Sequence, residues 1–247
     1  GETKVASYLV PMLRFQTNLM EAAFNENIKR FLFVGSVCSY PQNDIHFEDN
    51  MWNGMPKQND RIPGIAKRVG ELLGEAYFLE HKWDAVRIVR PANVYGPFDN
   101  FDPENAMVVP SLIHRALNSK NDLVVWGDGS AVRDFIHASD VANGMITCLA
   151  EGINIPVNLG SGGGVTIKII AETIASLTGR KIVWDVEKPS GDAIRIMDTE
   201  RAKKFGISSK ITIEEGIKST IDWYKNNQEL AGLRYNPFTE ASLLPGK

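Results

Sequence analysis

The 247-residue chain has few cysteines, no long apolar run and no excess of positive charge. Its two cysteines, Cys38 and Cys148, form no C-x-x-C pair or Cys/His ligand spacing. We therefore expect no disulfide framework and no metal site, and a reducing, cytoplasmic location. No apolar stretch reaches the roughly 18 residues of a membrane span. With 27 basic and 30 acidic residues, the formal net charge is -3, which predicts neither a nucleic-acid nor a membrane partner.

The chain does contain a regular alternation of helix and strand patterns. Its hydrophobic content of 43% is that of a globular protein with a sizeable core. Apolar residues at helical spacing predict helices over 12–26, 64–77, 109–117 and 140–150, from Thr166, and around Arg201 and Ile217. Short apolar runs predict strands at 30–34, 85–90, 122–126, 133–137, 156–160 and 181–185, and 39–61 has the composition of a loop. This alternation is typical of an α/β fold with a largely parallel sheet.

One glycine-rich segment, PVNLGSGGG at 156–164, lies between a predicted strand and a predicted helix. With Asp185 about 25 residues after Gly160, it resembles a dinucleotide fingerprint, in which glycines let a pyrophosphate approach the backbone. The G-x-G-x-x-G pattern fails at Val165, however. We interpret the segment as a turn before a helix capped by Thr166, and an unrelated nucleotide-binding domain stays as an alternative.

Four other segments carry more information: GSVCSYP at 35–41, AKRVGE at 66–71, the run from Arg90 to Ala116, and WGDGSAVRDFIHASDVA at 126–142. In this order they resemble extended short-chain dehydrogenase/reductases of the NAD-dependent epimerase/dehydratase family, and within it the enzymes that act on nucleotide sugars. The resemblance implies a Rossmann-type, doubly wound parallel sheet with a smaller C-terminal substrate lobe. Residues 1–100 and 133–160 would form part of the dinucleotide-binding domain, and 101–132 and 161–247 mainly the substrate lobe.

The family's opening G-x-x-G-x-x-G loop and its first strands have no counterpart in this sequence. We therefore expect the sequence to be the later part of a longer protein. The family's cofactor is NAD or NADP, and the residues that select between them belong to that missing region.

The same resemblance assigns roles to individual residues. It implies that Ser36 binds the reacting sugar oxygen, that Lys67 binds the nicotinamide ribose, and that Cys38 acts in epimerisation. The strand end that lines the nicotinamide pocket corresponds to Pro91, Ala92, Asn93 and Val94. The positions that hold sugar, base or phosphates correspond to Asn93, Arg115, Trp126, Arg133 and Arg195.

Physical chemistry supports several of these roles and leaves alternatives open. The planar guanidinium of arginine pairs phosphate oxygens in a bidentate manner, so an acidic chain would hold an anion through local arginines. Cys38 follows a strand, where the loops of a parallel sheet form binding sites. A buried structural role for Cys38, a solvated helix face for Lys67, a core position for Trp126 and an exposed salt bridge for Arg133 are the alternatives.

Two positions depart from the family pattern. The proton relay uses a tyrosine four residues before the lysine, which places both side chains on one helical face. Here that position is Pro63, which has no group that transfers a proton. Where related enzymes have a histidine acid that partners the cysteine, this chain has Met107. Ser36, Cys38, Tyr95 or bound water are the remaining proton sources.

Our functional hypothesis is a nucleotide-sugar epimerase/reductase that transfers hydride between NAD(P) and the sugar C4 of a nucleotide sugar, with a GDP-4-keto-6-deoxy sugar favoured. Because of Pro63 and Met107, the alternative is a catalytically impaired relative that binds a nucleotide sugar without turnover. The resemblance also implies a homodimer that pairs the helices around 13–23 and 65–77. The competing interpretation is that their apolar stripes face the sheet.

Overall fold

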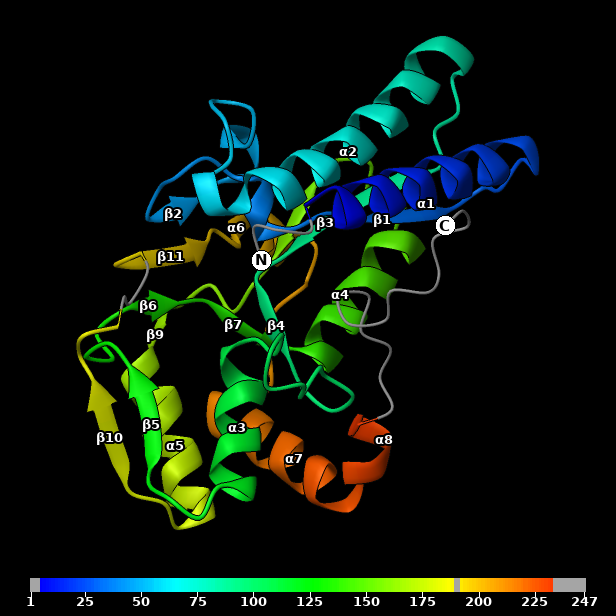
Figure 1. The fold of residues 1–247 in the computed structure, drawn as a ribbon. Helices are drawn as coiled ribbons and strands as arrows, with labels where there is room; N and C mark the ends of the chain where they lie inside the picture. Colours follow the sequence, from blue (N-terminus) through cyan, green and yellow to red (C-terminus); the bar gives the residue numbers. More distant parts are fainter. Residues whose placement is uncertain (1–4, 189–191, 233–247) are drawn as a thin grey trace.

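The computed structural model describes residues 5–188 and 192–232. The outermost parts of the two predicted lobes, 1–4 and 233–247, lie outside the described residues. Helices and strands alternate along the chain (Figure 1) in this order: α1 (Val5–Asn25), β1 (Phe31–Val34), η2 (Val37–Ser39), β2 (Ile45–His46), η3 (Glu48–Asn50), η4 (Gln58–Asp60), α2 (Arg61–His81), β3 (Val86–Pro91), β4 (Asn93–Tyr95), α3 (Val108–Asn118), β5 (Leu123–Trp126), β6 (Val132–Arg133), β7 (Phe135–His137), α4 (Ala138–Ala150), β8 (Val157–Leu159), β9 (Val165–Thr166), α5 (Ile167–Thr178), β10 (Ile182–Asp185), β11 (Ile194–Met197), α6 (Glu200–Lys204), α7 (Ile213–Asn226) and α8 (Gln228–Gly232).

The central feature is a parallel sheet in the order β1-β3-β8. Helices α1 and α2 lie side by side over one face of this sheet, and α4 covers the other face (Figure 1). Because all three strands are parallel, the segments that follow Val34, Pro91 and Leu159 leave the sheet at the same edge. In open α/β folds this carboxyl edge is where ligands bind. The predicted α/β class with a Rossmann-type sheet is confirmed.

Shorter strands extend this framework. β10 pairs with β5, β4 pairs with β7, and β2, β11, β6 and β9 form a small sheet in the order β2-β11-β6-β9. The single strand predicted over 133–137 is wrong in detail: it is divided at Asp134 into β6 and β7, which pair with different partners. The prediction missed β11, because its neighbours supply no alternating pattern long enough to be recognised.

Two large apolar clusters fill the molecule. One lies among α3, α5 and α7 and includes Leu112, Ile174 and Ile217, all buried. The other lies between the central sheet and α4 and includes Val89 and Val157. They support the division into two lobes, whose boundaries stay a prediction. No helix in the described part of the chain has the length and apolar character needed to cross a bilayer.

The glycine-rich segment closes around a buried carboxylate. Asp134 accepts hydrogen bonds from the Ser161 backbone N–H at 2.8 Å and from the Ser161 hydroxyl at 2.6 Å. A Cβ atom at Gly160 would collide with this carboxylate, so glycine is needed there for packing. The segment is therefore a structural turn that leads to α5, as we interpreted it, and α5 is capped by Thr166.

A buried ion pair fixes the sheet to α2. The guanidinium of Arg90, on β3, donates from Nε to Glu71 Oε1 at 2.9 Å and from Nη2 to Glu71 Oε2 at 2.7 Å. The two side chains are 2% and 4% exposed. Arg90 Nη1 also donates to the Tyr40 hydroxyl and to the Glu48 carbonyl. Burial lowers the pKa of Arg90, but the bidentate bonds and charge of Glu71 outweigh it and raise the pKa overall, so the pair stays charged.

We expect Glu71→Leu to lower the free energy of unfolding by about 3–5 kcal/mol, because it leaves the Arg90 charge buried without its partner. Urea denaturation measures this change. The double variant Arg90→Met with Glu71→Leu should cost less than the sum of the two single variants. Asp84→Asn, which removes the half-exposed partner of Arg87, is the control and should cost less than about 1 kcal/mol. If the losses in unfolding free energy of the two single variants add up to that of the double variant, Arg90 and Glu71 are not energetically coupled.

Candidate functional site

Three predicted catalytic side chains meet at the carboxyl end of β1. Ser36 begins the short helix η2, and its Oγ accepts the Cys38 backbone N–H at 3.1 Å. Lys67, on α2, donates from Nζ to the Val34 carbonyl at 2.8 Å. A Cβ atom at Gly64 would collide with the Cys38 carbonyl, so glycine lets the first turn of α2 touch this loop. Ser36, Cys38 and Lys67 are each half-buried.

The Cys38 thiol is held protonated by its surroundings. Burial raises the pKa of Cys38, and the negative charge of Asp60 raises it further. Hydrogen bonds from Ser36 and Arg195 and the charge of Arg195 act in the opposite direction without reversing the shift. Burial also lowers the pKa of Lys67, against the opposing effect of Cys38. The charge state of Cys38 therefore affects the pKa of Lys67.

Two predicted substrate arginines are register partners on adjacent strands. Arg133 of β6 and Arg195 of β11 are paired in a parallel ladder, which places both side chains on one face. Burial lowers the pKa of Arg133; the negative charge of Asp192 opposes this shift, and the charge of Arg195 adds to it. Like charges at paired positions repel. The pair is therefore suited to an anion that would bind between the two guanidinium groups.

Arg195 also links the arginine pair to the loop at residues 35–41, the catalytic loop, which carries the predicted catalytic residues Ser36 and Cys38. Its Nη1 lies 2.8 Å from Asp60 Oδ2, and its Nη2 donates to the Val37 carbonyl at 3.0 Å. Next to it, Lys57 forms an ion pair with Asp192, whose carbonyl accepts a hydrogen bond from Arg133. Two ion pairs therefore connect the segment before α2 with the region of β11. Asp60 pairs with Arg195 on β11, and Lys57 pairs with Asp192, two residues before that strand.

The other predicted binding residues lie on β5, on α3, and from the end of β3 into β4. Trp126 ends β5 and is 60% exposed, so it is not a core residue. The ammonium of Lys188 lies over its ring, 5.9 Å from the centroid. Arg115, on α3, donates to the Val124 carbonyl of that strand. Pro91 and Ala92 are buried, whereas Val94 is exposed. The Asn93 amide donates to the Asp134 carbonyl at 2.7 Å, so its side chain is already engaged with the backbone.

Two groups near these residues were not identified from the sequence: the carboxylate of Asp60 and the phenol of Tyr8. Asp60 ends η4 inside a polar stretch that carries no periodic signal. Tyr8 lies on α1 in the i, i+4 row of Met12, Gln16 and Met20, and the Gln16 amide of this face donates to the Ala66 carbonyl of α2 at 2.7 Å. Burial raises the pKa of Tyr8, and the charge of Cys38 raises it further. The phenol is therefore electrostatically coupled to the catalytic loop.

Pro63 and Met107 are the two residues that depart from the family pattern. Pro63 lies in the first turn of α2, one turn before Lys67. Met107 precedes α3 and is 62% exposed. Tyr95 does not join the site as a proton source: it is 2% exposed, and its ring packs edge-on against Phe135 and His137.

A parallel sheet with Ser36, Cys38 and Lys67 at its carboxyl edge defines a Rossmann-type protein of the short-chain dehydrogenase/reductase class. The chain belongs to the NAD dependent epimerase/dehydratase family, whose model matches residues 4–160.

Named relatives agree with this assignment. The chain is 35% identical over 237 residues to GDP-L-fucose synthase 1 of Arabidopsis thaliana, covering 92% of this chain and 73% of the relative. It is 31% identical over 247 residues to GDP-L-fucose synthase of Escherichia coli strain K12, covering 93% and 77%. The fold is similar to a GDP-L-fucose synthetase from Naegleria fowleri bound to NADP, with a TM-score of 0.85, 22% identity and coverage of 91% and 75%.

We expect Asp60→Asn to increase the alkylation rate of Cys38 by iodoacetamide at pH 8 severalfold. Removing this negative charge lowers the pKa of the thiol and frees Arg195 to stabilise the thiolate, which is the reactive form. Peptide mapping by mass spectrometry separates Cys38 from the buried Cys148. Asp49→Asn, at an exposed carboxylate paired with Arg201, is the control. An unchanged or slower reaction in Asp60→Asn would contradict the proposed coupling.

Proposed function

We propose that the protein is a nucleotide-sugar epimerase/reductase that transfers hydride between NADP(H) and the C4 carbon of a GDP-linked 4-keto-6-deoxy sugar. The observation that carries this proposal is the register pair Arg133–Arg195 beside the Ser36, Cys38 and Lys67 cluster. An anion held by the two guanidinium groups would have its attached sugar next to Ser36 and Cys38. The exposed Trp126 offers an aromatic face for the nucleotide base.

The nicotinamide end of the cofactor would lie at the carboxyl edge of the central sheet. Lys67 Nζ uses one N–H for the Val34 carbonyl, and the ammonium group has two others for ribose hydroxyls. Pro91 to Val94 leave the sheet next to β1 and would line the nicotinamide. When bound, this cofactor supplies or accepts the hydride. The turn at 160–164 is already filled by Asp134, so we place no pyrophosphate there.

The residues of this chain would then act on the sugar. Ser36 Oγ accepts the Cys38 N–H, and its hydroxyl also makes the hydrogen bond that lowers the pKa of the Cys38 thiol. When a sugar binds, this hydroxyl would turn to donate to the C4 oxygen instead. Cys38 would exchange a proton at a carbon next to the keto group, which is the chemistry of epimerisation. We assign the proton donor that Pro63 cannot provide to Tyr8, because α1 runs alongside α2 with Gln16 at Ala66 and Phe24 at Tyr77. Tyr8 lies two turns before Gln16 on α1, opposite the start of α2 where Pro63 stands.

A second candidate function is binding of a nucleotide sugar without turnover. Pro63 and Met107 favour it, since neither side chain transfers a proton. The two candidates make the same prediction for sugar binding and opposite predictions for hydride transfer, so one binding assay and one absorbance assay separate them.

We further propose that the protein is a cytoplasmic homodimer formed through α1 and α2. These helices pack against each other and leave large apolar side chains exposed on their outer sides, including Phe15 at 68%, Leu19 at 46%, Leu72 at 46% and Leu79 at 60%. Contiguous apolar surface of this kind is typical of a protein interface. It supports a dimer over the alternative that both stripes face the sheet only.

We expect Arg133→Ala and Arg195→Ala each to weaken GDP binding about tenfold or more, because each removes charge-assisted hydrogen bonds to phosphate. Isothermal titration calorimetry with GDP measures the change. Arg30→Ala is the matched control, since Arg30 is exposed and precedes β1 at the opposite edge of the sheet. Unchanged affinity in both site variants would remove the main support for the proposed function.

We expect Lys67→Ala to abolish oxidation of NADPH in the presence of a GDP-4-keto-6-deoxy sugar, measured as the loss of absorbance of the reduced cofactor. GDP binding should be retained, because Lys67 does not contact the arginine pair. Tyr8→Phe should lower kcat by about 10²–10⁴-fold, the usual contribution of a positioned acid. Lys218→Ala and Tyr77→Phe are the controls. Undiminished turnover in Lys67→Ala would refute the assignment.

A further inference from the structure

A pocket next to the catalytic loop contains a histidine that the proposed mechanism does not use. Its lining includes Tyr40, Gln42, Asn43, His46, Lys57 and Arg195. Arg195 connects this pocket to the reacting end, because the same guanidinium donates to the Val37 carbonyl beside Cys38. A ligand group bound here would therefore lie one side chain away from the thiol.

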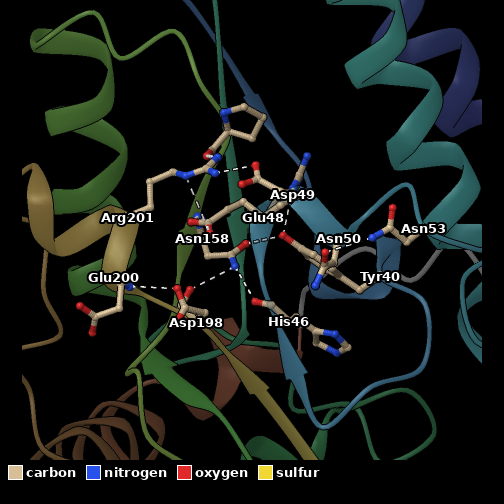
Figure 2. A network of polar contacts seen from close by, with 12 residues as sticks. Tyr40, His46, Glu48, Asp49, Asn50, Asn53, Asn158, Asp198, Glu200 and Arg201 are labelled. Atoms are coloured by element: carbon tan, nitrogen blue, oxygen red, sulfur yellow. Dashed lines mark hydrogen bonds and ion pairs between the residues drawn. The ribbon is translucent and has the colours of Figure 1, made fainter.

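The backbone carbonyl of His46 accepts two hydrogen bonds, whereas its ring forms none among the described residues. The His46 carbonyl accepts from the Asn158 amide at 2.9 Å and from the Asp198 N–H at 3.0 Å. Figure 2 shows the ring turned away from this polar network. The residue is 3% exposed, and neither ring nitrogen has a hydrogen-bond partner among the described residues. A buried polar group without a partner costs about 1–3 kcal/mol, so a group that reached either nitrogen and formed a hydrogen bond would recover that free energy.

The ring is also fixed in place and uncharged. It stacks on Tyr40 with the ring centroids 4.8 Å apart. Burial lowers the pKa of His46 to about 4, and the nearby charge of Arg195 acts in the same direction. At neutral pH the imidazole therefore offers one N–H donor and one bare nitrogen acceptor.

The N–H donor and the bare acceptor nitrogen of the His46 ring together indicate which kind of ligand group can bind there. A hydroxyl group both donates and accepts, so it satisfies a neutral imidazole nitrogen of either kind. A phosphate or carboxylate oxygen only accepts and would leave the bare nitrogen unpaired. Of the two cationic side chains in the lining, Lys57 is paired with Asp192, and the proposed function already assigns Arg195 to the ligand phosphate, so the lining has no further cation for a second anion. Amide side chains at Gln42 and Asn43 add further donors and acceptors.

We infer that this pocket is a hydroxyl-binding subsite for the sugar of the nucleotide sugar, and that His46 is a specificity-determining residue that recognises a sugar hydroxyl group. The inference rests on the proposed function and names the subsite that the sugar, as distinct from the nucleotide, occupies.

The test compares GDP with GDP-L-fucose as probes, using calorimetry on the purified protein. We expect the wild-type protein to bind GDP-L-fucose more tightly than GDP, and His46→Phe to reduce this preference about tenfold or more while the Kd of GDP stays constant. Phenylalanine keeps the stacked ring and removes both nitrogens. His46→Gln retains a donor and an acceptor and should keep most of the preference. His81→Phe, at an exposed histidine in the last turn of α2, is the control.

Three results would overturn the inference. An unchanged preference in His46→Phe would show that the ring does not contact the sugar, and an equal loss for GDP and GDP-L-fucose would assign the pocket to the nucleotide. If the wild-type protein binds neither probe, the proposed function fails first and the inference fails with it. Imidazole 15N shifts of His46 in the wild-type protein provide a measurement that does not depend on a variant folding: they should change on addition of GDP-L-fucose but not of GDP, and identical spectra would overturn the inference.

Discussion

The buried ion pair between Arg90 and Glu71 determines where most of the site lies. Through Glu71 it fixes α2, which carries Lys67, against the sheet. Through the Tyr40 hydroxyl and the Glu48 carbonyl it fixes the chain that follows the catalytic loop. Removing charges from water is costly, and additional hydrogen bonds help to offset that cost. Arg90 donates four of its five N–H groups to Glu71, Tyr40 and Glu48, so one side chain positions elements that are distant in the sequence.

The site combines two electrostatic environments that face each other. On the central sheet, burial and Asp60 keep the Cys38 thiol protonated. On the small sheet, Arg133 and Arg195 repel each other and are partly neutralised by acidic neighbours. Asp60 therefore takes part in both environments, because it pairs with Arg195 and its charge raises the pKa of Cys38. In the proposed function, a phosphate bound to Arg195 would act on the thiol through this aspartate.

The sequence was sufficient for the parts of the fold that rest on local periodicity or on ordered motifs. The strand before Ser36, the helix bearing Lys67 and the turn at 156–164 were predicted close to where they lie. It was not sufficient where position depends on long-range pairing. Arg133 and Arg195 became partners only through β11, a four-residue strand that pairs with β2 and β6. His46 and Asp60 lie in a stretch without periodicity, and their importance comes from burial and charge that tertiary contacts create.

The close contact at Gly64 limits how the site can change shape. Because the first turn of α2 touches the Cys38 carbonyl with no space for a Cβ atom, the helix and the catalytic loop form one mechanical unit. Any shift of α2 would therefore carry Lys67 together with Ser36 and Cys38. The small sheet is joined to this unit less tightly, because β6 and β11 share only two residue pairs in their ladder and are linked to the segment before α2 through the ion pairs of Lys57 and Arg195.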